Sequence, residues 1–264
     1  MDTTYDGSNS VIFDDVDSWE AWGLVPASRP TINLPSVRTN TIDIPGMNGV
    51  LDLSEVPLGY PTYGNRSGSL KFNVAHDKTG LSWDTAYSKI AAALHGRKVR
   101  CILKEDKSFY YEGRTTVGEW QTGQTFSTLS ITYDFAPYKL MRWTTTEDWL
   151  WNPFDFVNGV ILQSSFKDIP IVSGATKHIV FTQDFIGMAP VSPVFTVISN
   201  QVSSGMTLAV QNTGVSQRVK TFTLSSGLNY NPQIEFSCPT QTSKTILDIT
   251  GDGTLSIDFR PGRL

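Results

Sequence analysis

The sequence predicts a mainly β fold with one notable helix, divided into two domains. Apolar and polar residues alternate with period two through much of the chain, which is the spacing of half-buried strands. Glycine, proline and asparagine separate these alternations, as expected for turns. The chain has 264 residues, of which 39% are apolar and 17% charged, so it can bury a core as one large β domain or as two domains of ordinary size, and we expect two.

In the first half, alternation marks strands at 70–74, 99–103, 109–111 and 129–135. The last of these has an apolar residue at every odd position and a polar one at every even position, as a strand with one wet face requires. Lys104–Lys107 lies between two of the strands and is expected to form the tip of a hairpin.

The segment IPGMNGVLDL, residues 44–53, predicts another hairpin tip. Apolar residues alternate with Asp43 before it and with Asp52 within it, and 45–49 contains the glycines and asparagine that a reversing chain needs. None of its side chains could act as a nucleophile, a base or a metal cage. Its role is therefore expected to be conformational.

One segment, 81–96, has the features of an amphipathic helix. Ser82 can cap its first N–H groups, Asp84 suits the positive end of the helix dipole, and Gly96 supplies a left-handed stop. The stripe expected to pack on a sheet is Trp83, Ala86, Tyr87, Ile90, Ala91 and Leu94.

From about Met141 charged residues become sparse, and Ser and Thr become frequent. Short strands spaced by about ten residues, without a convincing helix, predict an antiparallel β-sandwich. The boundary is expected within 143–149, which divides the chain into domains 1–142 and 143–264. The expected strands are 179–181, 194–198, 206–210, 219–224, 233–236, 245–249 and 255–259.

Charge and composition argue against several classes of protein. The net charge is −4 and the only compact basic run is Arg97–Arg100, so specific nucleic-acid binding is not expected. The N-terminus resembles no secretory signal, and no apolar run approaches about 18 residues, so we expect no membrane segment and a soluble protein made in the cytosol. Cys101 and Cys238 are expected to be buried reduced thiols.

Two segments of the sequence invite comparison with ligand sites. Asp248–Gly253 resembles a calcium loop, but its third position is Thr250 and its twelfth is Phe259, so a turn between two strands is the better interpretation. Aromatic residues that could stack on sugar rings gather near the boundary, although core or interface packing is their usual role. These are Trp143, Trp149, Trp151, Phe154 and Phe156.

No catalytic constellation is visible. His76, His95 and His178 lie in unrelated contexts, and Asp14–Asp17 is expected to be a solvated acidic run. We therefore assign no catalytic, cofactor-binding or metal-binding residue, no cofactor, and no enzymatic activity.

Short motifs of the chain, taken in order, resemble those of the distal tail protein family of siphophages, which are long-tailed phages. The likeness covers about 11–140 and the last eight residues, with Asn48 and Ala136 standing where the family has Asp. The motifs are a "WGL" strand at Trp19–Leu24, Arg29–Pro30, the IPGMNGVLDLSE hairpin at 44–55, Tyr63–Arg66, Leu94–Arg97, Tyr110–Arg114, Ala136–Lys139 and the closing IDFRPGRL at Ile257–Leu264.

This resemblance implies a structural protein of the virion tail tip. Members form a hexameric ring that joins the tail-tube protein to the tail-associated hub protein and, through a galectin-like C-terminal domain, to receptor-binding or other baseplate components. DNA passes through the ring, so the lining of the channel is expected to carry zero or negative charge. The arms that would join protomers are expected at 104–126 and at the IPGMNG hairpin.

Two alternatives stay open at this point. The runner-up is a carbohydrate-binding module in which 143–264 recognises host cell-wall sugar through exposed aromatic residues. The other is a cell-wall hydrolase, which would need an acid pair or a metal that the sequence does not show.

Overall fold

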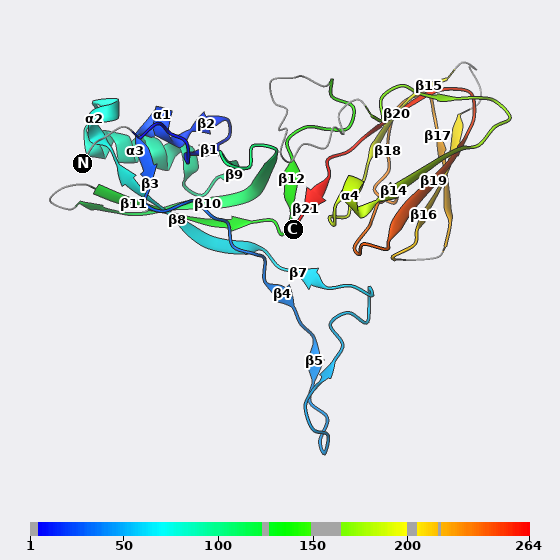
Figure 1. Ribbon diagram of the computed structural model, residues 1–264, viewed down its shortest axis with the longest axis horizontal. Coiled ribbons are helices and arrows are strands. Elements are labelled where there is room, and N and C mark those ends of the chain that lie inside the picture. The colour runs from blue at the N-terminus through cyan, green and yellow to red at the C-terminus, as the bar shows by residue number, and fades with distance from the viewer. Residues whose placement is uncertain (1–4, 123–126, 149–164, 200–204, 216–217) are drawn as a thin grey trace. The chain divides into compact units, whose positions relative to one another are not determined.

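The computed structural model describes residues 5–122, 127–148, 165–199, 205–215 and 218–264 (Figure 1). Most of its regular structure consists of antiparallel strands, which confirms the predicted β class. The chain forms two compact units: residues 1–38 with 63–139, and residues 39–62 with 140–264. None of the helices among the described residues is long and apolar enough to cross a membrane.

A twisted antiparallel sheet is the centre of the first unit. Its two longest strands pair with Gly113 opposite Phe135, and a bulge between Val117 and Trp120 shifts their register. The strand order is β2 (Val16–Asp17), β1 (Val11–Phe13), β9 (Lys98–Leu103), β10 (Phe109–Thr122), β11 (Ser127–Phe135), β8 (Arg66–Val74) and β3 (Leu24–Pro26). The unit also contains β4 (Val37–Arg38), which pairs with β7 (Thr62–Tyr63).

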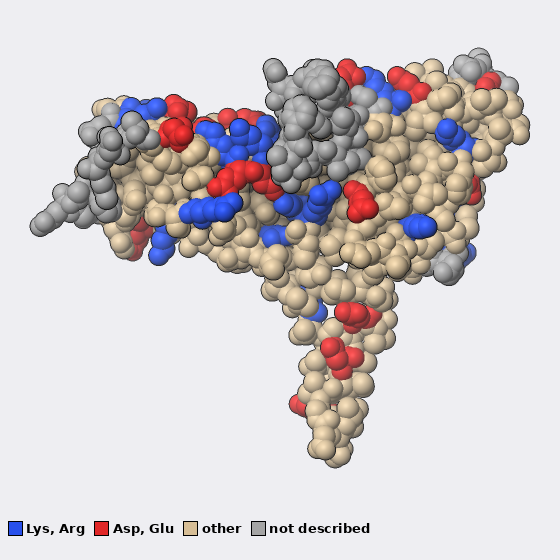
Figure 2. Space-filling view, in the orientation of Figure 1, with Lys and Arg blue, Asp and Glu red and all other residues tan. Residues whose placement is uncertain are grey.

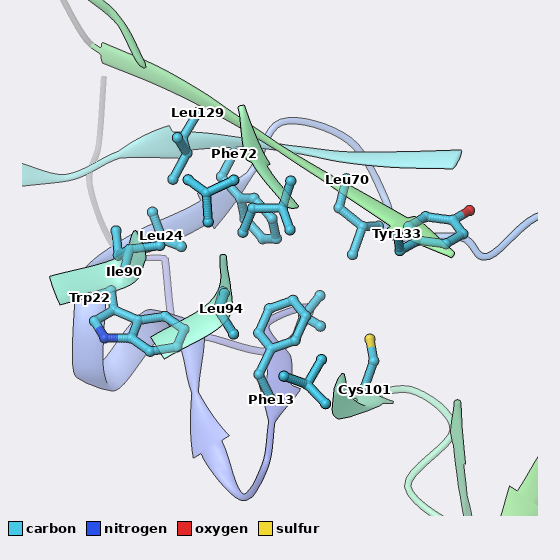
Figure 3. Close-up of a cluster of buried hydrophobic side chains, with 14 of the residues drawn as sticks. Phe13, Trp22, Leu24, Leu70, Phe72, Ile90, Leu94, Cys101, Leu129 and Tyr133 are labelled. Atoms are coloured by element: carbon cyan, nitrogen blue, oxygen red, sulfur yellow. The ribbon is translucent and has the colours of Figure 1, made fainter. Parts of the chain in front are cut away.

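The predicted helix is α3 (Trp83–Leu94), and it packs on this sheet. The Ser82 hydroxyl accepts from the Thr85 backbone N–H, as predicted for the helix cap. Gly96 has a φ of 72°, which is the left-handed conformation predicted for the helix stop. Ile90 and Leu94 enter a core with Phe72 and Leu129 (Figure 3). Trp83, by contrast, is 51% exposed, so the apolar stripe is only partly buried.

The "WGL" segment differs from the expected strand. Residues Ser18–Trp22 form a short helix, α1, whose first N–H groups bind the carboxylate of Asp17. Gly23 ends the helix with a φ of 64°, and strand β3 begins only at Leu24. An Asp cap and a left-handed glycine outweigh the β preference of the two tryptophans here. The other short helix of this unit is α2 (His76–Thr79).

The second unit is a sandwich of two four-stranded antiparallel sheets with one apolar core. One sheet has the order β13 (Ile169–Ile171), β20 (Gly253–Asp258), β15 (Val194–Ser199), β18 (Gly227–Tyr230). The other has the order β14 (Lys177–Thr182), β19 (Lys244–Thr250), β16 (Met206–Asn212), β17 (Lys220–Leu224). The remaining elements are α4 (Gln183–Ile186), the pair β12 (Lys139–Met141) and β21 (Gly262–Arg263), and the hairpin of β5 (Thr41–Ile42) and β6 (Leu51–Asp52).

One strand predicted in the sandwich is absent. Residues 233–236 form no strand, and only Phe236 makes a bridge, to Val191. Asp248–Gly253 includes the turn between two strands that was expected, and because β19 and β20 belong to different sheets, this turn carries the chain from one sheet to the other. Strands β13 and β18 were not predicted from the sequence.

Candidate assembly surface

The segment 39–62, called the arm below, contains the predicted IPGMNG hairpin (Figure 1). Its strands β5 and β6 pair Thr41 with Asp52 and Ile42 with Leu51, and among the described residues they pair with no other strand. Every residue from 36 to 52 is exposed. An isolated two-stranded hairpin is marginally stable in water, so the arm lacks the cover that a sheet or helix would give it.

The side chains of the arm are unusually apolar for such an exposed segment. Met47 and Val50 near the tip are 46% and 52% exposed, and Val56 is 72% exposed. Exposed apolar side chains gathered on one short segment are typical of interaction sites in soluble proteins. The other exposed apolar residues of the arm are Ile42, Ile44, Leu51 and Leu58.

Local hydrogen bonds shape the hairpin. At the tip, the Met47 N–H donates to the Ile44 carbonyl at 3.1 Å. Nearer its base, the Ser54 N–H donates to the Asp52 carboxylate at 2.8 Å, and the Ser54 hydroxyl accepts from the Asn40 N–H at 2.8 Å. Gly46 and Gly49 have φ values of 86° and 82°, as the expected turn required. The hairpin therefore has a defined shape although its surface is uncovered.

The charge of the arm has one sign. Residues 39–62 contain no Lys or Arg, whereas Asp43, Asp52 and Glu55 are acidic. Figure 2 shows a hairpin that is mostly uncharged, with acidic groups along it. The surface that covers the arm is therefore expected to be apolar and neutral or basic. The sequence indicated the tip alone; the lack of Lys and Arg across 39–62 was the signal for the whole arm.

Other motif residues make contacts inside the first unit. Arg66 is 2% exposed and donates to the carbonyls of Pro137 and Asn33 at 2.7 and 3.0 Å. Burial lowers the pKa of its guanidinium below the ordinary value. Tyr63 and Tyr138 meet edge to face with ring centroids 6.1 Å apart. The motifs at Tyr63–Arg66 and Ala136–Lys139 therefore hold each other.

A second pair of motifs meets at the end of α3. The Arg114 guanidinium donates to the Gly96 carbonyl at 2.8 Å, and the Thr115 hydroxyl donates to the Leu94 carbonyl at 2.7 Å. Gly113 has to be glycine, because a Cβ there would lie 2.2 Å from the Asp134 carbonyl oxygen. These contacts account for Leu94–Arg97 and Tyr110–Arg114 as parts of the fold.

The closing motif is part of the second unit's core. The Phe259 N–H donates to the Thr145 hydroxyl at 3.1 Å, and Arg260 donates to the carbonyls of Met141 and Arg142. Gly262 is buried and forms a parallel bridge with Gly187. The motifs described above are accounted for by contacts within the fold. The tip of the IPGMNG hairpin differs, because it packs against no other segment of the described residues.

The other expected arm, 104–126, is partly fixed. Lys104 pairs with Asp17 at 3.1 Å, Glu105 with Arg29 at 2.5 Å, and Asp106 with Lys139 at 2.7 Å. These ion pairs hold the turn between β9 and β10 against its own unit. Residues 123–126, at the end of the β10–β11 hairpin, lie outside the described residues.

The acidic and histidine residues that the sequence analysis examined for catalysis or metal binding lie in contacts or helix ends of the fold. Asp14–Asp17 is not merely solvated: Asp14 accepts from the Arg100 N–H at 2.8 Å, and Asp17 caps α1. His178 contacts Asp248 at 2.6 Å on the exposed side of the sandwich, and His95 follows the last turn of α3. No group of three or more potential metal ligands occurs among the described residues.

Both cysteines are buried free thiols, as expected, and burial raises the pKa of each above its ordinary value. Of the aromatic cluster considered for sugar, only Trp143 is described, and it lies beside the guanidinium of Arg142. Trp149, Trp151, Phe154 and Phe156 lie outside the described residues.

Comparison with solved structures shows what fold these contacts build. The chain is similar to the Dit protein (gp 19.1) of SPP1, a paradigm of the hub adsorption apparatus in phages that infect Gram-positive bacteria. The TM-score is 0.61 over 97% of this chain and 99% of that one, at 14% sequence identity. The resemblance to distal tail proteins is confirmed as a likeness of fold. No protein-family model matches the chain, and no curated protein does.

Proposed function

We propose that this protein is a structural component of a siphophage tail tip, without enzymatic activity. Six copies form a ring that joins the tail tube to the tail-associated hub protein and the receptor-binding apparatus, and DNA passes through its centre. The observation that carries the proposal is the likeness to SPP1 Dit over nearly the whole of both chains. The exposed apolar arm supports it, because an uncovered hairpin suits a protein that functions in an assembly.

The two predicted domains have different parts in this proposal. Residues 1–142 form the ring, and 143–264 form a galectin-like sandwich that faces other baseplate proteins. A closed ring needs heterologous contacts, in which one surface of a protomer meets a different surface of the next. The arm is our candidate for one such surface, and the channel lining carries zero or negative net charge.

Mass determination in solution followed by negative-stain imaging tests the ring. The expected result is a six-fold ring with a central hole, formed by the full chain. A strictly monomeric protein at high concentration, with no rings in the images, would contradict the proposal. A measured positive charge along the channel would contradict its account of DNA passage.

A matched pair of triple variants tests the arm. Ile44→Ser with Met47→Ser and Val50→Ser removes apolar surface from the tip, and is expected to leave the fold intact but abolish assembly with the arm's partner. The control is Val172→Ser with Ile198→Ser and Leu228→Ser, which removes three apolar side chains of even greater exposure from the sandwich. If the arm variant assembles as well as the control variant, the arm is not an assembly surface.

A further inference from the structure

Strand β18 lies at the edge of its sheet, and among the described residues it pairs with β15 alone. An edge strand presents unpaired backbone N–H and C=O groups that can pair with another chain, and soluble proteins protect such edges with lysine or proline. The other three edge strands of the sandwich carry this protection, since β13 contains Pro170, β14 contains Lys177 and β17 contains Lys220. Strand β18, with the sequence GLNY, contains neither residue.

The outer face of this unprotected edge is apolar. Leu228 and Tyr230 are 76% and 62% exposed. In the register they lie opposite Thr196 and Val194 of β15, whereas Phe195 between those two is fully buried in the core. Residues directly opposite one another on paired strands share a face of the sheet. Both side chains of β18 therefore point away from the core and lie on the same face.

The two strands that form this side of the sheet carry no charge. Residues 185–217, which include β15, contain no Asp, Glu, Lys or Arg, and neither do residues 221–234, which include β18. A charged side chain placed against this edge would lose hydration without gaining an ion pair from either strand. The chemistry of the edge thus favours an apolar and uncharged partner.

Hydrogen bonds hold the chain after β18 away from the sheet. The Gln233 N–H donates to the Asn231 side-chain oxygen at 2.9 Å, and the Asn212 side-chain amide donates to the Glu235 carbonyl at 2.7 Å. These bonds belong to the segment that was predicted as a strand but is not paired as one. The edge that β18 offers is therefore only four residues long.

The start of β18 is fixed as well, and the short edge limits what can bind there. The Ser225 N–H donates to the Asn229 side-chain oxygen at 2.9 Å, and the Asn229 amide donates back to the Ser225 carbonyl at 2.7 Å. Two such short strands from two copies of the chain would bury little surface, whereas stable interfaces between folded proteins bury about 800 Å² per partner. A flexible segment suits the edge better, because backbone hydrogen bonds supply much of its affinity.

We propose that β18 binds an extended, uncharged segment of another protein, which adds to the four-stranded sheet as a fifth strand. Apolar side chains at every second position of this segment cover Leu228 and Tyr230, because those two residues share one face. Backbone hydrogen bonds supply the affinity and the apolar pairs supply the specificity. The proposal is independent of ring formation, since the edge belongs to a single chain.

Selection of displayed linear peptides on the full-length protein tests the proposal. We expect enrichment of sequences with apolar residues at alternate positions and few charged ones. Leu228→Lys gives β18 the protection that the other edges have, and it should weaken the binding of a selected synthetic peptide at least about tenfold, which is about 1.4 kcal/mol. The matched control is Val180→Lys, at a position 39% exposed on the edge strand β14, and it should leave binding unchanged. The thermal transition of each variant checks its fold.

N-methylation of the peptide identifies strand addition. Methyl groups on alternate amides along the edge that faces β18 should abolish binding, and methyl groups along the other edge should not. The proposal is overturned if no peptide is enriched, if Leu228→Lys binds the peptide as tightly as the wild type, or if both methylated peptides bind equally.

Two other occupants of the edge have their own outcomes, and either outcome would overturn the proposal. If sedimentation shows that Leu228→Lys abolishes an association between copies of the chain, a second copy covers the edge. If a chito-oligosaccharide displaces the peptide, and Tyr230→Ala removes binding of that oligosaccharide, the face is a sugar platform.

Discussion

The Arg66 guanidinium and the Pro137 carbonyl are joined by a 2.7 Å hydrogen bond across 71 residues of sequence. The same guanidinium reaches the Asn33 carbonyl and lies 5.4 Å from the centroid of the Tyr111 ring. Three separate segments of the first unit are therefore held by one buried cation. A residue that the sequence showed only as part of a short motif is therefore central to the fold of the first unit.

Replacing Arg66 with Met should destabilise the first unit. The change leaves two carbonyl acceptors without their donor, and each unsatisfied buried polar group costs about 1–3 kcal/mol. We expect a loss of about 2–4 kcal/mol in the free energy of unfolding, measured by chemical denaturation. Lys71→Met, at an exposed position of the same strand, should change it by less than about 0.5 kcal/mol. Equal effects of the two variants would contradict the role given to Arg66.

The sequence predicted those elements whose local pattern agrees with their tertiary surroundings. Residues 129–135 alternate cleanly, and β11 is buried at every odd position as expected. Residues 233–236 have a similar pattern but leave the sheet, because the Asn231 turn and the Asn212 bond direct the backbone elsewhere. Strand β18, Gly227–Tyr230, was missed because glycine and serine mark turns more often than strands.

The candidate site was predictable only in part for a related reason. The turn residues of 45–49 indicated a hairpin tip, since turn chemistry is local. Whether a hairpin is covered depends on segments far away in the sequence. The exposure of Met47 and Val56 could therefore not be derived from their neighbours. The role of Arg66 was hidden in the same way.

Gly187 should tolerate no side chain. Its φ of 79° and ψ of −162° fall in a region that is essentially restricted to glycine, and a Cβ would lie within van der Waals overlap of the Gly262 carbonyl oxygen. Gly187→Ala should reduce the stability of the sandwich by about 2–5 kcal/mol.

Gly174 provides a matched control for this prediction. It has a φ of 80°, but no atom lies within 4 Å of the position its Cβ would take. Gly174→Ala should therefore cost only the backbone strain, about 1–2 kcal/mol. Thermal unfolding of both variants measures the difference, and a Gly187→Ala protein as stable as Gly174→Ala would show that the closing motif can shift without cost.

Asp17 should make the first unit sensitive to acid. Burial by itself raises the pKa of this carboxyl, but hydrogen bonds from Lys104, Ser10 and the Trp19 N–H outweigh it, so the pKa lies below its ordinary value. A carboxylate with a lowered folded pKa adds stability above its unfolded pKa, about 3.9 for Asp, and loses it as the pH falls through the folded value. The stabilisation is therefore fully present at neutral pH.

Asp17→Asn tests this contribution, because Asn still caps a helix but cannot carry the charge. The variant should melt below the wild type at pH 7, and the gap should close as the pH falls below about 4. Asp43→Asn, on the exposed arm, is the control and should not change the melting temperature. If the difference in melting temperature between Asp17→Asn and the wild type stays constant from pH 7 to acidic pH, the charge of Asp17 is not the source of that difference.

The arm should be the first part of the free chain to be cut by a protease of suitable specificity, and assembly should protect it. Exposed loops with few contacts are the preferred sites of proteolysis. Trypsin finds no Lys or Arg within 39–62, whereas thermolysin, which cuts before large apolar residues, meets Ile44, Met47 and Val50 in exposed positions. We expect thermolysin to cleave the unassembled protein within the arm before any buried strand is cut.

In the assembled protein the same bonds should be cut at least about tenfold more slowly, because the apolar side chains are then covered. Mass spectrometry of the fragments locates the cuts, and equal cleavage rates before and after assembly would mean that the partner binds elsewhere and leaves the arm in water.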